Sequence, residues 1–478
     1  MPLVQEAKAR LALLQKYHHI NAFTYTLPAA EILNQVQLAQ EGKLQGKLIA
    51  LKANFCVKSW PSDACSKVLS GFKSPFDSTI VTRLKSEGAV IMGLTNMDEF
   101  AMGSTGETSV YGATLNPWGS NFSCGGSSSG SAAAVATSSV YCAIGSDTGG
   151  SVRIPASHCG VVGFKPTRGA ISRYGLIAYA NSLDVPGIFA QKVNHVSNVF
   201  DVIAGDDEHD MTSRDVNKLT KPINHSNIRI GLVNEFNFPE LDSNVVQAWK
   251  SAAEIFNLLG LKIQSGLTLP TLPDCLPAYY VIALAEASSN LARYDGIRYG
   301  HRTSFSVSAY SQQNSNQLHL EYARTRTEGF GDEVQRRILM GSLALTRKKD
   351  NPESYSSDYF LANLIREKLK RDFDKIFENV DLILLPTSPW SPLRQKIDAK
   401  NENVINSYLE DTLTVPASLA GLPAISVPAR LCSDTLGPIG VQIIGRSGDD
   451  RLVLEAASLL EKGFQFTPLV DIASHVEK

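Results

Sequence analysis

The sequence predicts an α/β protein with a central sheet that helices cover on both faces. Short β-branched and aliphatic runs alternate with longer segments of helical periodicity along its 478 residues, which is the pattern of buried strands joined by covering helices. Hydrophobic residues make up 43% of the chain and charged residues only 19%. This composition supports a large core and excludes disordered and collagen-like proteins.

Six apolar runs are the candidate strands. In chain order they are Leu48–Leu51, Ala89–Leu94, Ile228–Val233, Asp381–Leu385, Ala424–Val427 and Gly440–Ile444. A helix is expected after the third strand, because a helical stripe of apolar residues ends at Gly260, and glycine commonly terminates helices. The stripe comprises Val245, Val246, Trp249, Ala252, Ala253, Phe256 and Leu259.

One large domain fits the chain better than several small ones, because no tandem repeat and no long Pro- or Ser-rich linker divides it. We expect an N-terminal helical segment over residues 1–45 and a single catalytic domain over residues 46–478. Residues 277–378 are more helical and more charged than the rest, and we expect them to form a cap-like region against the sheet.

Charge and composition restrict the function further. The 45 Lys and Arg residues against 47 Asp and Glu residues leave a net charge of -2, so the chain does not grip nucleic acid over most of its surface, although a local patch or a partner protein could. The seven cysteines lack CxxC pairing and are odd in number, which favours a reducing compartment. The nine histidines form no HxH, HExxH or Cys/His grouping, so we expect no catalytic metal in this chain.

The chain shows no sign of a membrane segment. No apolar run approaches the roughly 18 to 20 residues that span a bilayer, and the N-terminus lacks a secretory hydrophobic region, so we expect a soluble protein. Basic residues near the start (Lys8, Arg10 and Lys16) stand beside Glu6. They fit a weak mitochondrial address or a surface helix, and these residues alone favour the surface helix.

The segment that carries candidate chemistry is nearly uncharged. Residues 119–164 contain only two charges, Asp147 and Arg153, and include the runs GGSSSGSAAAVA and GSDTGGS. The Ala-rich run after Ser131 predicts a buried central helix whose N-terminus would offer free amide groups to an anion. A Gly/Ser loop of this kind more often cradles a phosphate than carries a nucleophile, but the GxxxxGK[ST] and strand–GxGxxG patterns are absent.

A serine nucleophile in this segment would need a base. None of the histidines stands in a GxSxG or triad context, but a lysine that has lost its proton through burial can take that role. Lys52 is the best candidate, because it ends the apolar strand LIALK and is followed by Ala53 and Asn54. The alternative is that Lys52 only marks the solvent end of a strand.

Three blocks of sequence together resemble the amidase signature family. They are LKAN around Lys52, GGSSSGSAAAVA from Gly125, and GSDTGGSVRIPASHCGVVGFKPTRG from Gly145, in the family's order and spacing. The resemblance implies that family's fold, with a large mixed central sheet. Later blocks resemble the A subunits of glutamyl-tRNA(Gln) amidotransferases more than generic amidases, and they are 95–107, 181–190, 285–300, 330–341, 410–428 and 437–445.

The family motif implies a catalytic trio. It assigns the nucleophile to Ser151, the bridging serine to Ser127 with a cis peptide bond, and the base to Lys52. Neutral Lys52 would take a proton from Ser127, Ser127 would take one from Ser151, and Ser151 would attack the side-chain amide carbon to form an acyl-enzyme. The alternative for Ser127 is ordinary hydrogen bonding within a loop.

The same motif implies an oxyanion hole. Backbone N–H groups of Thr148, Gly149, Gly150 and Ser151 would face the developing negative charge, which requires donors already in place and close approach without side chains. Without the resemblance, the two glycines would be interpreted as a tight turn.

Free glutamine carries an α-carboxylate and an α-ammonium group, so its site needs one cation and one anion. Alignment with the motif implies that Arg337 binds the carboxylate, Asp411 binds the ammonium group and Tyr279 hydrogen-bonds the substrate. Each residue has a structural alternative: Arg337 on a solvated helix face, Asp411 as a helix cap, and Tyr279 in the core.

The sequence departs from the family pattern at three points. Ser129 stands where GGSSGGSA has a glycine, Ala53 stands where many members have aspartate, and Lys52 lies close to the start of the chain. The first two changes leave the trio intact. The third suggests a divergent organellar member with an altered small partner, and we expect the mitochondrial matrix, with the bacterial cytoplasm as the alternative.

The resemblance implies a glutaminase component that supplies ammonia for converting Glu-tRNA(Gln) to Gln-tRNA(Gln). The chain itself would need no cofactor, because ATP and Mg would bind to a partner B subunit, which would also hold most of the tRNA. A small third subunit would complete the complex. Two alternatives stay open: a free-standing amidase for another small amide, and a catalytically idle scaffold.

Overall fold

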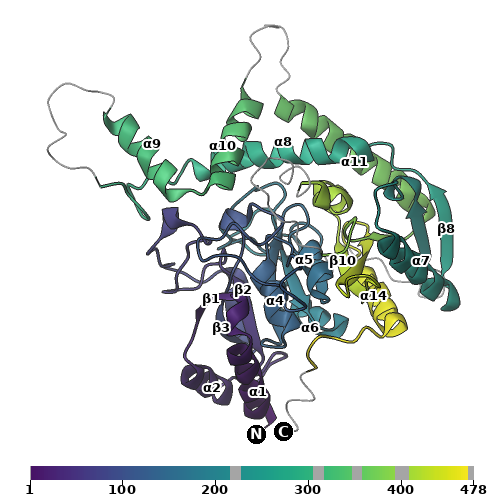
Figure 1. Ribbon diagram of the computed structural model, residues 1–478, viewed down its shortest axis with the longest axis horizontal. Coiled ribbons are helices and arrows are strands. Elements are labelled where there is room, and N and C mark those ends of the chain that lie inside the picture. The colour runs from purple at the N-terminus through teal and green to yellow at the C-terminus, as the bar shows by residue number, and fades with distance from the viewer. Residues whose placement is uncertain (1, 216–227, 305–316, 347–357, 393–407, 472–478) are drawn as a thin grey trace.

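One eleven-stranded sheet runs through the described part of the protein (Figure 1). The computed structural model describes residues 2–215, 228–304, 317–346, 358–392 and 408–471. The spatial order of the strands is β1-β3-β2-β4-β6-β5-β10-β11-β9-β7-β8. The strands are β1 (Phe23–Thr26), β2 (Leu48–Lys52), β3 (Val90–Thr95), β4 (Cys142–Asp147), β5 (Val162–Lys165), β6 (Val185–Ala190), β7 (Arg229–Val233), β8 (Lys262–Leu267), β9 (Leu382–Pro386), β10 (Ala424–Leu431) and β11 (Pro438–Gly445).

Helices connect and cover these strands. The α-helices are α1 (Pro2–Lys16), α2 (Ala29–Gln37), α3 (Thr79–Ser86), α4 (Ser129–Ala136), α5 (Arg153–Cys159), α6 (Val193–Ile203), α7 (Ser243–Leu258), α8 (Leu272–Leu291), α9 (Gln317–Gly329), α10 (Asp332–Leu345), α11 (Asp358–Asn379), α13 (Val415–Ala420) and α14 (Asp450–Phe464). The short 3-10 helices are η1 (His18–Ile20), η2 (Lys67–Leu69), η3 (Glu99–Ala101), η6 (Asn234–Phe236) and η8 (Glu410–Leu413).

The sheet is mixed, as the resemblance implies. β2 pairs in parallel with β3 and β4, and β7 pairs in parallel with β8 and β9. Between these two parallel parts, β6, β5, β10 and β11 form antiparallel pairs with their neighbours. All six candidate strands are confirmed, with small differences at their ends.

Successive side chains of β2 pack into two different hydrophobic clusters, which shows that both faces of the sheet are buried here. Leu48 and Ala50 belong to the hydrophobic cluster that contains residues of α1, α2 and α4. Ile49 and Leu51 belong to a second cluster, which contains residues of α3 and α6. Because neighbouring side chains of a strand point to opposite faces, helices must cover this sheet on both sides, as predicted.

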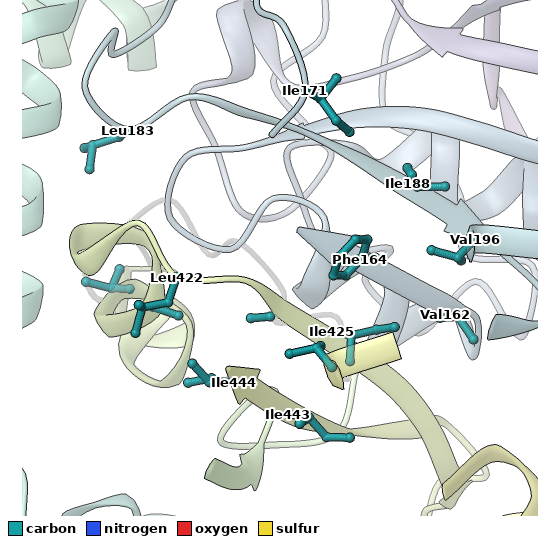
Figure 2. Packing of buried hydrophobic residues seen from close by; sticks show 14 of the residues in the cluster. Val162, Phe164, Ile171, Leu183, Ile188, Val196, Leu422, Ile425, Ile443 and Ile444 are labelled. Atoms are coloured by element: carbon teal, nitrogen blue, oxygen red, sulfur yellow. The ribbon is translucent and has the colours of Figure 1, made fainter. Parts of the chain in front are cut away.

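The centre of the sheet is held together by apolar contacts across strands (Figure 2). Ile425 on β10 lies opposite Phe164 on β5 and Ile443 on β11. The ring of Phe164 meets that of Phe200 on α6 edge to face, with 5.3 Å between the ring centroids. These contacts join the two halves of the sheet into one core.

The helix after β7 is present as predicted, with one difference. α7 ends at Leu258, and Gly260 has φ +81°, which suits the stop that the sequence indicates. Leu259, which the apolar stripe includes, lies beyond the helix and is 51% exposed. The stripe therefore continues one position farther than the buried face.

The region after β8 is helical. α10 and α11 pack against α8, and α8–α11 lie along one side of the molecule, at the top of Figure 1, whereas α1 and α2 lie at the bottom. The first 45 residues also contain β1, which pairs antiparallel with β3 at the edge of the sheet. In the described ranges, no helix combines the length and apolar character that crossing a membrane would require.

Candidate active site

The site is built at the carboxyl ends of two neighbouring parallel strands. Lys52 is the last residue of β2, and Ser146 is close to the end of β4. The Lys52 side-chain nitrogen Nζ lies 3.0 Å from Ser146 Oγ and 2.7 Å from Ser127 Oγ. Lys52 is completely buried, which excludes the alternative that it marks the solvent end of a strand.

Burial gives Lys52 the property that a base needs. It lowers the pKa of Lys52 from its ordinary value to about 7, against the opposing effects of the Asp98, Asp147 and Asp184 carboxylates. A second buried lysine, Lys165, also has its pKa lowered by burial to about 7. Lys165, however, donates to the carbonyl oxygens of Pro166 and Leu422, so only Lys52 combines a low pKa with a contact to a candidate serine.

Ser127 stands in the loop that leads into the central helix. The Gly126–Ser127 peptide bond is cis, as the resemblance implies. The Ser127 carbonyl accepts a hydrogen bond from the backbone N–H of Asp98 at 3.1 Å. α4 follows from Ser129, slightly earlier than the sequence indicates, and all of its residues are buried.

Ser151 is the accessible member of the candidate trio. It is 7% exposed, whereas Lys52 and Ser127 are 0% exposed. Its backbone carbonyl accepts a hydrogen bond from Ser128 N at 3.3 Å, which joins the two serine loops. A nucleophile must reach the substrate while its proton carriers stay away from water, and this difference in exposure meets both needs.

Hydrogen bonds with neighbouring side chains hold the residues between β4 and Ser151 in place. Thr148 Oγ1 donates to Asp184 at 2.7 Å. The carbonyl of Gly149 accepts hydrogen bonds from Arg153 at 2.9 Å and Ser418 at 3.2 Å. In a trans peptide, N–H and C=O point in opposite directions, so the Gly150 N–H points away from Arg153.

Glycine is required at positions 149 and 150 of this loop for steric reasons. A Cβ atom at Gly149 would stand 2.6 Å from the Tyr279 hydroxyl oxygen. A Cβ atom at Gly150 would overlap Thr414 Oγ1 and stand 2.7 Å from Ile154 Cδ1. The loop can therefore approach its neighbours closely only without side chains.

The two charges of the nearly uncharged segment form one buried ion pair. Arg153 donates to both carboxylate oxygens of Asp147, at 2.9 and 3.0 Å, and both residues are 0% exposed. Burial alone would raise the pKa of Asp147, but Arg153, Lys165 and the Val152 N–H together outweigh it, and the pKa lies below its ordinary value. The sequence predicts no role for these two residues. In the structure they adjoin the candidate oxyanion loop, because Arg153 also donates to the Gly149 carbonyl.

Replacing Arg153 with methionine should destabilise the protein by about 3–5 kcal/mol, because Asp147 is left as an unpaired buried charge. Urea unfolding at neutral pH measures this loss. The pair's contribution should be present above the ordinary carboxylate pKa and be lost as the pH falls through the lower folded-state pKa of Asp147. The double variant Arg153→Met/Asp147→Leu should lose less, and an equal or larger loss would contradict this account.

Arg337 lies inside the protein and not on a solvated helix face. It is 3% exposed on α10, whereas its neighbour Arg336 is exposed. Its guanidinium group donates to Glu333 at 2.7 Å and to the Tyr179 hydroxyl at 2.9 Å. The ring of Tyr408 lies 5.7 Å from the guanidinium carbon.

Asp411 is a second buried charge close to Arg337. It accepts hydrogen bonds from Ser104 at 3.1 Å and from the Tyr280 hydroxyl at 3.0 Å. Tyr280 also presents its ring to Arg337, 5.9 Å from the guanidinium carbon. Burial raises the pKa of Asp411 to about 6, although Tyr280 and Arg337 lower it. The side chain thus faces other side chains and does not cap a helix.

Tyr279 and Tyr280 both reach the candidate site, but they contact different neighbours. The Tyr279 hydroxyl lies against Gly149, near the candidate oxyanion loop. Tyr280 makes the contacts with Asp411 and Arg337. Ser104 was also not predicted, although it lies within one of the blocks that carry the resemblance, because its contact with Asp411 joins distant parts of the chain.

No group of three or more His, Cys, Asp or Glu side chains within the described ranges could hold a metal ion. All seven cysteines lie within the described ranges, are buried and form no disulfide. The groups gathered at this site include the Lys52–Ser127 contact, the buried charges of Arg337 and Asp411, and the Arg153–Asp147 ion pair.

Comparison with known proteins shows the family to which this chain belongs. Residues 3–454 match the family described as Amidase. The chain is 44% identical to the A subunit of glutamyl-tRNA(Gln) amidotransferase from Trichodesmium erythraeum over 437 residues, which are 89% of this chain and 86% of that protein. It is also 44% identical to the protein of the same name from Methanosarcina acetivorans, with the same coverage.

A solved structure shows the same fold. The crystal structure of the A subunit of glutamyl-tRNA(Gln) amidotransferase from Thermotoga maritima is 33% identical and has a TM-score of 0.77. The similarity covers 98% of this chain and 95% of that one. The large mixed sheet covered by helices is thus confirmed by a related structure as well as by the strand pairing.

Proposed function

Since this chain belongs to the amidase family, we propose that it is the glutamine-hydrolysing A subunit of a glutamyl-tRNA(Gln) amidotransferase. The observation that carries the proposal is the pair of buried opposite charges, Arg337 and Asp411, joined by Tyr280. Glutamine presents a carboxylate and an ammonium group that such a pair can bind. A free-standing amidase for uncharged amides would not need either charge, and an idle scaffold would not need the buried Lys52–Ser127 contact.

In the proposed mechanism, Lys52 begins as the neutral amine. It takes the proton of Ser127 while Ser127 takes the proton of Ser151, and the Ser151 oxygen bonds to the side-chain amide carbon of glutamine. The lysine then returns the proton through Ser127 to the amide nitrogen, and ammonia leaves as the C–N bond breaks. Water cleaves the resulting ester by the same proton route and releases glutamate.

The loop beside the nucleophile would stabilise the negative oxygen of each tetrahedral intermediate. We assign this role to the backbone N–H groups of Thr148, Gly149, Gly150 and Ser151. The hydrogen bonds from Arg153 and Ser418 to this loop support the assignment. Donors that are held in place before the reaction require no reorganisation energy during it. Tyr279, against Gly149, would contact the substrate near the reacting amide.

The chain would act within a complex. We propose a B subunit that binds ATP, Mg and most of the tRNA, and a small third subunit. The identity to proteins named as the A component of this amidotransferase supports the assignment. Purification of the tagged chain from its source, followed by assays for glutamine hydrolysis and glutamine-dependent Gln-tRNA formation, tests it. Recovery as a monomer without a B-type partner, or with no glutaminase activity, would contradict the proposal.

Two further assignments stay proposals. We assign residues 1–45 to a helical segment and residues 46–478 to the catalytic domain, with β1 joining the two through the sheet. We assign the chain to the mitochondrial matrix, with the bacterial cytoplasm as the alternative that the bacterial and archaeal relatives support. Seven cysteines without a disulfide fit both compartments. Imaging of the tagged chain in its own cells distinguishes them.

Asp411→Ala should reduce kcat/KM for glutamine by tens- to thousands-fold, since losing a buried charge partner costs about 2–5 kcal/mol. The loss should be much smaller with 4-carbamoylbutanoate, which lacks the α-amino group. Arg337→Ala should show the opposite preference, with 4-aminobutanamide as the analogue that lacks the carboxylate. Steady-state kinetics on both pairs of substrates measure the effect, and equal losses on glutamine and its analogue would refute the assignment.

A further inference from the structure

A histidine and a glutamate that the proposed mechanism does not use face each other in the core. His158 lies near the end of α5, the helix that begins shortly after Ser151, and Glu410 begins η8. His158 Nε2 and Glu410 Oε1 are 3.1 Å apart, and the two side chains are 1% and 8% exposed. Burying two ionisable groups costs free energy unless they pair with each other or with other polar groups.

Both groups favour their uncharged forms. Burial lowers the pKa of His158 to about 3. Burial, with the added effect of the Asp411 carboxylate, raises the pKa of Glu410 well above its ordinary value. Both shifts oppose a charged pair, so this contact favours a carboxylic acid at Glu410, whose O–H can donate, facing a neutral imidazole, whose Nε2 can accept.

The pair lies between two parts of the candidate site. Glu410 directly precedes Asp411, whose carboxylate contacts Tyr280. His158 packs against the glycine loop that leads to the bridging serine, because a Cβ atom at Gly125 would stand 3.1 Å from its Nδ1. Among the described residues neither ring nitrogen makes a hydrogen bond, so the 3.1 Å approach of Glu410 Oε1 to Nε2 is the polar contact closest to one for this ring.

We propose that the His158–Glu410 pair is a positioning element. It holds the start of η8 against α5, the helix that follows Ser151, without adding net charge. Asp411 then stands at a fixed place and presents the one negative charge of η8 to the α-ammonium group of glutamine. This inference rests on the proposed function and deepens it, because it identifies what holds the ammonium-binding residue. Neither His158 nor Glu410 touches the reacting atoms in this scheme.

The test compares Glu410→Leu with Glu410→Gln in the complex that contains the full chain. Leucine removes the polar contact, so the KM for glutamine should rise about tenfold, which corresponds to roughly 1.4 kcal/mol, and kcat should change by less than about threefold. Glutamine at position 410 is neutral and can still donate to Nε2, so Glu410→Gln should stay within about threefold of the parent. Melting temperatures of both variants report any general loss of stability.

Two further measurements separate positioning from a merely structural role. With 4-carbamoylbutanoate, which lacks the ammonium group, Glu410→Leu should be close to the parent. His158→Phe should raise the KM for glutamine as Glu410→Leu does, and the double variant should be no worse than either single one, because the two residues act as a unit.

The contrary results are equally definite. Equal losses on glutamine and 4-carbamoylbutanoate, an unchanged KM in Glu410→Leu, or a Glu410→Gln variant as impaired as Glu410→Leu would each overturn the positioning role. Failure of the unchanged complex to hydrolyse glutamine would overturn the proposed function and this inference together. The parent activity, measured in parallel, therefore distinguishes the two failures.

Discussion

Ser151→Ala should abolish glutamine hydrolysis, with turnover falling by at least about 10⁴-fold, as expected when an activated nucleophile is removed. The change deletes one oxygen and adds no bulk at a residue that is 7% exposed. The melting temperature should therefore stay close to that of the parent. Release of glutamate from glutamine by the purified complex measures the effect.

Ammonia provides the control within the same complex. If Ser151 acts only in the glutaminase step, the Ser151→Ala complex should still form Gln-tRNA when ammonium salt replaces glutamine. Ser129→Ala is the matched variant, because Ser129 is buried as the first residue of α4 but its hydroxyl contacts Thr114 at 3.1 Å. It should keep glutamine hydrolysis. Turnover of Ser151→Ala within tenfold of the parent, or failure with ammonia, would exclude the proposed role.

Lys52→Arg should be about as inactive as Lys52→Met, with losses of a similar order to Ser151→Ala. Arginine keeps the positive charge but stays protonated at neutral pH, so it cannot take a proton from Ser127. Both variants are assayed for glutamine hydrolysis and for ammonia-dependent product formation. An active Lys52→Arg enzyme would show that charge, and not proton transfer, is what Lys52 contributes.

The pH dependence provides an independent test of the same residue. Because only neutral Lys52 can act as the base, kcat/KM should rise with pH through about 7 in the parent. Asp411, with a pKa of about 6, adds a further loss below that pH for glutamine. This further loss should be absent with 4-carbamoylbutanoate. Lys165→Met, which removes the other lysine with a pKa of about 7, should leave the profile of the remaining activity unchanged.

The fold class and strand positions could be predicted because they depend on local patterns. Each candidate strand is an apolar run long enough to cross a buried sheet, and its position in the chain does not depend on its partners. The order of the strands could not be predicted from the residues alone. β5 pairs with β10, for example, although the two lie far apart in the sequence, and the contact between Phe164 and Ile425 depends on how the two halves of the sheet meet.

The candidate trio was accessible from the sequence because its members lie in short, recognisable blocks. A lysine that ends an apolar strand is predicted to be close to the sheet's carboxyl edge, and β2 places Lys52 there. The structure added that Lys52 contacts Ser127 and Ser146, and that Lys165 has the same low pKa with different partners. Burial makes a lysine basic at neutral pH, but only its contacts decide whether it can serve a nucleophile.

The sequence by itself determined an α/β core and, through its family resemblance, a serine–lysine set and one arginine and one aspartate suited to an amino acid. The tertiary structure alone decided which of them meet. Tyr280, and not its neighbour Tyr279, contacts Asp411, and Ser104 reaches the same carboxylate from 307 residues away in the chain. The reason is physical: local patterns set which face of a strand or helix is buried, whereas contacts between distant side chains depend on the packing of whole elements against one another.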